Sequence, residues 1–156
     1  MGFSDMFKKD KKEKKEMFSK DLIKLGTKVD SMEEAVEIAG RLLYENGYVK
    51  EEYLAAMQER EKDVSTYMGN GVAIPHGTNE SKKYIESTGI SFVQIPAGVD
   101  FGDGNIAKLV IGIAGQGDEH LKILQNLATA LQDEDKTNLL VQTDDKQVVL
   151  DSLLQE

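Results

Sequence analysis

Apolar residues recur at helical spacing after a clear helix start near Ser31. The segment Ser31-Met-Glu-Glu34 has the spacing of a capping box, in which the Ser31 hydroxyl accepts from the third helical N–H and the Glu34 side chain reaches back. Asn46-Gly47 is a stop signal of the kind that ends helices. The pattern therefore predicts a helix over about residues 32–46, with a core stripe of Ala35, Ile38, Ala39, Leu42 and Leu43.

The same periodicity predicts three more helices. They cover about residues 51–62, 118–131 and 144–154. Asp118 stands where it can cap the second of them. The expected core positions are Leu54 and Met57 in the first, Leu121, Leu124, Leu127, Ala128 and Leu131 in the second, and Val148, Val149 and Leu153 in the third.

Short apolar runs between these helices predict strands. They are Leu22–Leu25, Val72–Ile74, Ile90–Ile95 between Gly89 and Pro96, and Ala107–Ala114. A Gly/Asp-rich loop is expected over residues 99–105, between the last two strands. Because strands alternate with helices, the pattern indicates an α/β domain, a class whose ligand sites lie beyond strand ends.

His76 stands just where one of these strands ends. Pro75 cannot donate to a sheet ladder and biases Ile74 towards an extended conformation, so the strand stops before the histidine. Gly77 has no Cβ, so the chain can turn sharply there and a large group can approach the imidazole from that side. The segment presents a ring nitrogen at the rim of a sheet, although Pro-His-Gly by itself also fits an ordinary loop histidine.

The chain has no cysteine and only one other histidine, His120. Thiol catalysis and Cys-based metal sites are therefore excluded, and the Gly-x-Ser-x-Gly elbow of hydrolases is missing. If the chain does covalent chemistry, His76 is the expected nucleophile, because a neutral imidazole can accept a phosphoryl group and its phosphoramidate can donate it. Two widely separated histidines without clustered carboxylates support no metal site, and we expect no cofactor.

Charge is distributed unevenly along the 156 residues. Residues 1–20 carry seven lysines and four acidic residues, whereas the remainder carries 12 basic and 24 acidic residues. The acidic body disfavours nucleic-acid binding and suits a basic protein partner. The lysine-rich head is either a short membrane-surface helix or a solvated extension, and we expect it to contribute little to the core. The anchors of the membrane-surface alternative would be Phe3, Met6, Phe7, Met17 and Phe18.

Size and composition indicate one folded domain of a soluble protein. A chain of this length can bury a proper core, and no apolar run approaches the roughly 20 residues that span a bilayer. It opens with no recognisable signal sequence, and without cysteine it has no disulfide framework. These features predict a cytoplasmic protein, with no direct membrane insertion.

A long series of motifs resembles one bacterial family. In chain order they are Tyr-Met-Gly, Ala-Ile-Pro-His-Gly-Thr78, Gly-Ile-Ser-Phe-Val-Gln-Ile-Pro-Ala-Gly-Val-Asp-Phe-Gly102, Leu-Val-Ile-Gly-Ile-Ala114, Glu-His-Leu121 and Leu-Ala-Thr-Ala-Leu131. These motifs resemble enzyme IIA of the phosphoenolpyruvate-dependent sugar phosphotransferase system. Within it, the chain is most similar to the mannitol branch of the mannitol/fructose class. The resemblance covers about residues 21–154, so residues 1–20 are expected to be an extension and 21–156 the domain.

The resemblance implies a single domain with a mostly parallel, mixed five-stranded sheet flanked by helices. It matches His76 to a phosphorylated histidine that accepts through the ring nitrogen further from the backbone. It matches His120 to a second active-site histidine and Arg60 to a phosphate-binding arginine, although a lone helix-end arginine would otherwise suggest an exposed surface residue. At the start of its helix, His120 would be held neutral by the positive end of the macrodipole and could donate to phosphate.

Three further positions have supporting roles in this comparison: Asn70, Gly77 and Thr78. Asn70 departs from the family pattern, because relatives in the mannitol branch can carry Glu there. An amide takes up no proton, so a carboxylate role at this position is in doubt.

The function implied is a relay of phosphate from the phosphocarrier HPr, through His76, to a cysteine of the IIB domain of a sugar permease, with mannitol the favoured sugar. Two alternatives remain open from sequence. One is a regulatory module of the same fold that is phosphorylated but controls a transporter or regulator. The other is an acidic adaptor that binds a partner and never carries phosphate.

Overall fold

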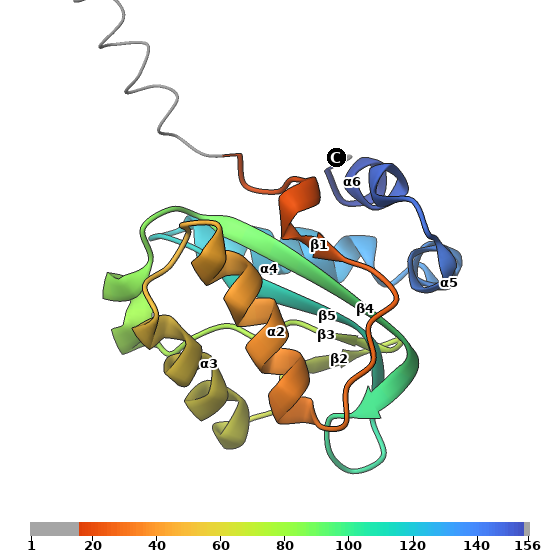
Figure 1. Ribbon diagram of the computed structural model, residues 1–156, viewed down its shortest axis with the longest axis horizontal. Helices are drawn as coiled ribbons and strands as arrows, with labels where there is room; N and C mark the ends of the chain where they lie inside the picture. The colour runs from red at the N-terminus through yellow and green to blue at the C-terminus, as the bar shows by residue number, and fades with distance from the viewer. Residues whose placement is uncertain (1–15, 155–156) are drawn as a thin grey trace, which may run out of the picture.

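The computed structural model describes residues 16–154 and contains a single five-stranded sheet. Helices lie on both faces of the sheet, and the first and last described helical segments lie side by side at one end of the molecule (Figure 1). In chain order the elements are η1 (Lys20–Leu22), β1 (Ile23–Lys24), α2 (Met32–Glu45), α3 (Glu52–Asp63), β2 (Tyr67–Gly69), β3 (Val72–Ala73), η2 (Asn79–Tyr84), β4 (Gly89–Asp100), β5 (Ile106–Ala114), α4 (Glu119–Ala130), α5 (Glu134–Gln142) and α6 (Lys146–Leu154).

The sheet is mixed, as expected, and its order is β1-β4-β5-β3-β2. The pairs β1–β4 and β3–β5 are parallel, whereas β4–β5 and β2–β3 are antiparallel hairpins. The two central strands β4 and β5 form the longest ladder and are buried on both faces, which explains their continuous apolar sequences.

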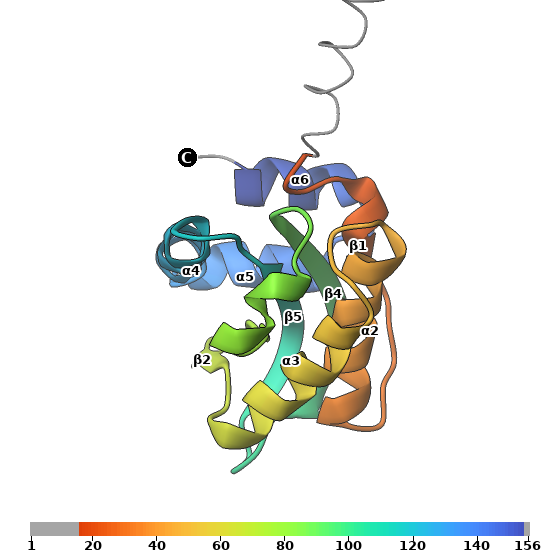
Figure 2. The same cartoon turned by 90° about the vertical axis from the view of Figure 1, so that its left-hand side faces the viewer.

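Helices α2 and α3 cover one face of this sheet, and α4 and α5 cover the other (Figure 2). Tyr53 and Met57 of α3, Leu43 of α2, and Phe92 and Ile111 of the central strands are among the largest fully buried side chains. The core therefore lies mainly between the α2–α3 layer and β4–β5.

The capping signal at Ser31 works as the sequence indicates, with one change of partner. The Ser31 hydroxyl accepts from the Glu34 N–H at 3.1 Å, but the Glu34 carboxylate accepts from the N–H of Asp30, not from that of Ser31. The helix ends at Asn46 and Gly47, where Gly47 adopts a φ of 82°.

Strand β4 is longer than the expected run, because it continues beyond Pro96 to Asp100. Its register against β5 shifts between Gln94 and Val99, so Pro96 lies in an irregularity where the missing N–H costs no ladder bond. The loop expected from residue 99 begins only after Asp100.

Several local predictions fail where packing, not periodicity, decides. Leu121 was expected in the core stripe of α4 but is 61% exposed, and Ile123 is buried instead. Asp118 flanks α4 but makes no side-chain capping bond. The strand β2 and the helix α5 have weak apolar patterns and were not predicted.

The expected boundary of the extension is also wrong, because the folded body includes residues before 21. Phe18 is only 3% exposed and belongs to the hydrophobic core, and the Met17 carbonyl accepts from the N–H of Ile90 at 2.9 Å. Burial in the core removes the apolar surface of this ring from water, which stabilises the fold. The other expected anchors, at residues 3, 6 and 7, lie outside the described residues.

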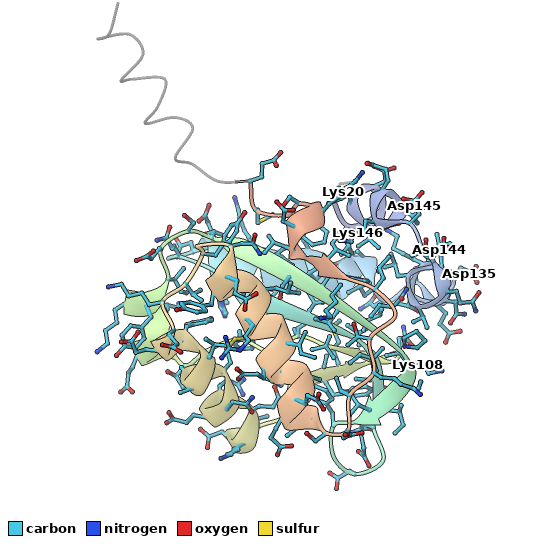
Figure 3. The ribbon with its side chains drawn as sticks, viewed as in Figure 1. Lys20, Lys108, Asp135, Asp144, Asp145 and Lys146 are labelled. Atoms are coloured by element: carbon cyan, nitrogen blue, oxygen red, sulfur yellow. The ribbon has the colours of Figure 1, made fainter. Side chains whose placement is uncertain are left out.

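The C-terminal helix α6 packs beside this N-terminal segment. The Lys146 ammonium donates to the Lys20 carbonyl at 3.3 Å, and Figure 3 shows the two side chains at the same end of the molecule. Both chain ends described in the structure therefore meet at the β1 edge of the sheet.

We predict that Phe18→Ala lowers the free energy of unfolding by about 3 kcal/mol, because it removes a buried aromatic ring. Its neighbour Met17 is 37% exposed and provides the matched control. Met17→Ala should cost less than about 1 kcal/mol in the same urea titration. Equal losses for the two variants would contradict the burial seen here.

Candidate functional site

The parallel pairing of β3 and β5 brings the two histidines together. His76 follows the end of β3 and His120 follows the end of β5, and the carboxyl ends of parallel neighbours lie at the same sheet edge. The pairing extends to an isolated bridge between His76 and Ile113. The two imidazole rings lie with their centroids 5.0 Å apart, at an interplanar angle of 65°.

The two rings open onto a cavity of about 370 Å³. Most of the predicted site residues meet there, and others join them that the sequence did not suggest. The lining comprises Tyr53, Arg60, Asp63, His76, Gly77, Thr78, Asn79, Lys82, Ile85 and His120. In Figure 2, which views the molecule from this end, η2 lies between α3 and the start of α4.

A backbone hydrogen bond selects the reactive nitrogen of His76. Its Nδ1 lies 2.9 Å from the carbonyl oxygen of Ile74. A carbonyl oxygen can only accept, so Nδ1 carries the proton and Nε2 keeps a free lone pair when the ring is neutral. This is the nitrogen further from the backbone, the one that the family resemblance implied.

Both histidines are held in the neutral form. Burial lowers the pKa of His76 most, and the Arg60 guanidinium lowers it further, whereas the bond to Ile74 and the Glu61 carboxylate act in the opposite direction. Burial also lowers the pKa of His120, to about 4, with smaller contributions from His76, Lys82 and Arg60. A nucleophilic imidazole must be neutral, and these shifts leave both rings neutral near neutral pH.

Arg60 lies in the last turn of α3 and projects to the same cavity. Its Nη1 donates to the carbonyl of Val64 at 2.8 Å, which holds the guanidinium plane in one orientation. A guanidinium has five N–H donors, so this bond leaves others for phosphate oxygens.

Tyr53 is the most important residue that the sequence analysis missed. Its hydroxyl accepts from the N–H of Gly77 and donates to the carbonyl of Ile113, each at 2.9 Å, so it joins the His76 segment to β5. Burial raises the pKa of Tyr53 to about 12, so the hydroxyl stays protonated. No motif in the sequence marks this position.

The role expected for Gly77 is wrong in one respect. A Cβ at Gly77 would lie 2.5 Å from the Tyr53 ring and 2.4 Å from the Ser81 hydroxyl. On the side where a Cβ would project, the space is therefore filled by the protein and is not an approach for a large ligand, although Gly77 lines the cavity elsewhere. Thr78, the next residue, lines the cavity and its carbonyl accepts from the Ser81 hydroxyl at 2.7 Å.

Gly115 has the same function at the second histidine. A Cβ there would lie 2.5 Å from the Cα of His120, so only glycine allows the end of β5 to pass so close to the start of α4. The Thr88 hydroxyl further fixes this turn, since it donates to the Glu119 carboxylate at 2.5 Å and accepts from the N–H of Gln116.

Asn70 is not brought to the cavity. It lies in the turn between β2 and β3 with a φ of 54°, and its amide donates to the carbonyls of Leu131 and Gln132, each at 3.2 Å. These two hydrogen bonds connect the turn to the end of α4. An amide can donate both of them, and neither requires a group that takes up or releases a proton. Lys82, by contrast, lines the cavity and was missed, because its position in η2 carries no sequence signal.

An α/β domain with a free imidazole nitrogen, a second neutral histidine and an oriented arginine around one cavity has the parts of a group-transfer protein that works through a covalent histidine intermediate. The comparisons identify which such class applies. A family model described as "Phosphoenolpyruvate-dependent sugar phosphotransferase system, EIIA 2" matches residues 16–156. The chain belongs to this family of enzyme IIA phosphotransferase components.

Relatives and solved structures agree with this assignment. The mannitol-specific phosphotransferase enzyme IIA component of Bacillus subtilis is 49% identical over 126 residues, which is 81% of this chain and 88% of the relative. The structure of an Escherichia coli complex of enzyme IIAMTL and phosphorylated enzyme IIBMTL is 41% identical with a TM-score of 0.85, covering 89% of this chain and 98% of that one. The nitrogen regulatory protein IIA-Ntr of Neisseria meningitidis is 26% identical with a TM-score of 0.75, covering 88% and 96%.

We predict that His120 makes stability depend on pH between about 6.5 and 4. Its pKa is lower in the fold than its ordinary value of 6.5, so in this window the unfolded chain binds more protons and stability falls as the pH falls. Urea titrations of the wild type and His120→Gln should show the wild type losing its advantage over the variant as the pH drops from 7 to 4. A difference that does not change with pH would contradict the lowered pKa.

Proposed function

We propose that this chain is the phosphoryl carrier of a mannitol phosphotransferase system. It accepts phosphate from phospho-HPr on Nε2 of His76 and passes it to a cysteine of a IIB domain. The observation that carries the proposal is the bond from Nδ1 of His76 to the Ile74 carbonyl, which leaves Nε2 as the free nucleophile in the wall of the cavity. The mannitol-specific names of the Bacillus relative and of the Escherichia coli complex support the sugar and the IIB partner.

Each transfer exchanges one bond to phosphorus for another. The lone pair of Nε2 attacks the phosphorus of the HPr phosphohistidine, the new N–P bond forms, and the donor imidazole leaves with the electron pair of the old one. In the second step a cysteine thiolate of IIB attacks, an S–P bond forms, and Nε2 recovers its lone pair. Phosphoryl transfer of this kind needs mainly positioning and charge stabilisation.

The cavity offers these contributions in separate side chains. Arg60 binds phosphate oxygens with the donors that Val64 leaves free. His120, neutral and beside His76, donates one hydrogen bond to a phosphate oxygen or to its partner ring. Lys82 adds positive charge at the same cavity. No cofactor or metal enters this scheme.

Two exposed apolar side chains adjoin the residues of the site and fit a surface for protein partners. Val64, whose carbonyl holds Arg60, is 63% exposed, and Leu121, which follows His120, is 61% exposed. Both partners must reach Nε2 of His76, so HPr and IIB would use this rim in turn. We infer a cytoplasmic location from these partners, and in residues 16–154 no helix is both long and apolar enough to cross a membrane.

A regulatory role is the second candidate, and the Neisseria relative is the observation that favours it. Transfer distinguishes the two, because a sugar carrier passes phosphate rapidly from His76 to a purified mannitol IIB domain and a regulator does not. A surface adaptor is tested by the first experiment below, since it would gain no phosphate.

We predict that His76→Ala folds normally yet accepts no phosphate from phospho-HPr, because the nucleophile is gone. Intact mass after incubation with phosphoenolpyruvate, enzyme I and HPr should show one acid-labile phosphate on the wild type and none on the variant. His120→Ala is the matched control, and its phosphate should still map to His76. Acid-labile phosphate on His76→Ala would overturn the assignment.

We also predict that Arg60→Lys slows transfer from phospho-HPr by about tenfold or more, because an ammonium keeps the charge but loses the planar fork. The only other arginine, Arg41, provides the control. It lies on α2 and is paired with the carboxylate of Glu37 at 2.9 Å. Arg41→Lys should transfer at the wild-type rate, and an Arg60→Lys rate within about twofold of wild type would return Arg60 to the surface class.

A further inference from the structure

A buried carboxylate follows the cavity arginine in the chain, and its only effect described so far is to raise the pKa of His76 slightly against the effect of burial. Glu61 is only 4% exposed, in the last turn of α3. Its Oε2 accepts from the N–H of Thr66 and its Oε1 accepts from the Thr66 hydroxyl, each at 2.7 Å. We call this pair of bonds the Glu61–Thr66 clamp.

Helix physics does not explain an acid at this position. The C-terminal end of a helix disfavours negative charge, and a buried carboxylate costs free energy unless it is fully hydrogen-bonded. Both oxygens of Glu61 meet that condition through one residue, and bonds to an ionised acceptor are short and strong. The two bonds therefore join the end of α3 to Thr66 and favour one path of residues 64–66.

The clamp is the first of three consecutive links that lead to His76. Glu61 holds the N–H and hydroxyl of Thr66, and the Thr66 carbonyl accepts from the N–H of Ile74 at 3.1 Å. The Ile74 carbonyl in turn accepts from Nδ1 of His76 at 2.9 Å. Any displacement of the Thr66 peptide is thereby transmitted to the carbonyl that sets the orientation of the imidazole.

A second path leads from the clamped segment to Arg60. The Val64 carbonyl that accepts from the guanidinium at 2.8 Å lies two residues before Thr66. One short segment, residues 64–66, thus carries the acceptor that orients Arg60 and the carbonyl that supports Ile74. The segment therefore contacts both Arg60 and the residue whose carbonyl orients His76.

We propose that Glu61 and Thr66 are positioning residues for phosphoryl transfer, which hold the Arg60 guanidinium and the His76 imidazole at their working separation. This inference rests on the function proposed above. Both residues are buried and neither lines the cavity, so the loss of the clamp should lower the turnover of bound phospho-HPr and leave the binding of phospho-HPr unchanged.

The test compares two threonines that are both buried and both donate through their hydroxyls. Thr66→Val removes the hydroxyl donor to Glu61 at nearly constant volume. Thr137→Val is the matched control, because Thr137 lies on α5 and donates to the Glu134 carbonyl at 3.0 Å. Figure 1 shows α5 at the end of the molecule opposite to η2.

Rapid-quench transfer from phospho-HPr should give a kcat about tenfold lower for Thr66→Val, since small misplacements of reacting groups are costly, with KM within about twofold. Thr66→Ser, which restores the hydroxyl, should recover most of the rate, and Thr137→Val should keep it. Nitrogen NMR should show the His76 imidazole protonated at Nδ1 in the wild type. In the Thr66→Val variant the same imidazole should populate both neutral tautomers.

Glu61→Gln keeps the test decisive if Thr66→Val fails to fold. The amide has the size of the carboxylate, but it keeps only one acceptor oxygen where Glu61 uses two, so one of the two bonds from Thr66 is lost and the other loses the assistance of the charge. We therefore expect kcat to fall by about threefold or more with KM unchanged. A wild-type kcat for Glu61→Gln, or an equal loss for Thr137→Val and Thr66→Val, would overturn the inference. Phosphate on His76→Ala would instead reject the proposed function, so the two failures are distinguishable.

Discussion

The parallel pairing of β3 with β5 is the constraint on which the site depends. It places the ends of two strands at one sheet edge, and each strand is followed by a histidine. The bridge from His76 to Ile113 and the two bonds of the Tyr53 hydroxyl continue this pairing beyond the regular strand. His76 and His120 are 44 positions apart in the chain, and this pairing is what makes them neighbours.

The electrostatic potential of the cavity is set by burial and by nearby charged side chains, and it differs from what the net charge of the whole chain suggests. The protein has a formal net charge of −9, yet Arg60 and Lys82 line the cavity, with Asp63 as an acidic neighbour. Burial lowers the pKa of both histidines, Arg60 lowers both further, and Lys82 lowers that of His120. In the proposed function the same cations would attract the oxygens of a transferring phosphate, so one arrangement would favour both the neutral nucleophile and its anionic substrate.

The site residues are positioned mainly by hydrogen bonds to backbone groups and by close packing of neighbouring segments. These contacts support the site with few side-chain ion pairs. Backbone carbonyls orient His76 and Arg60, and glycines at 77 and 115 allow the neighbouring segments to come within contact distance of Tyr53 and His120. Catalysis that consists mainly of positioning benefits from such rigid support, because the reacting atoms need little reorganisation at the moment of transfer.

The sequence by itself determined the elements with strong local signals: the capped helix after Ser31, the strand that Pro75 ends, and the extended central strands. Its motifs also identified the family and, by resemblance, the three residues His76, His120 and Arg60 that the fold brings to one cavity. Only the tertiary structure decided that Phe18 belongs to the core, that Leu121 faces outward, that β4 passes Pro96, and that Tyr53 and the Glu61–Thr66 pair support the site. The physical reason is that periodicity and turn chemistry act between near neighbours in the chain, whereas burial and hydrogen-bond partners are set by residues that only folding brings together.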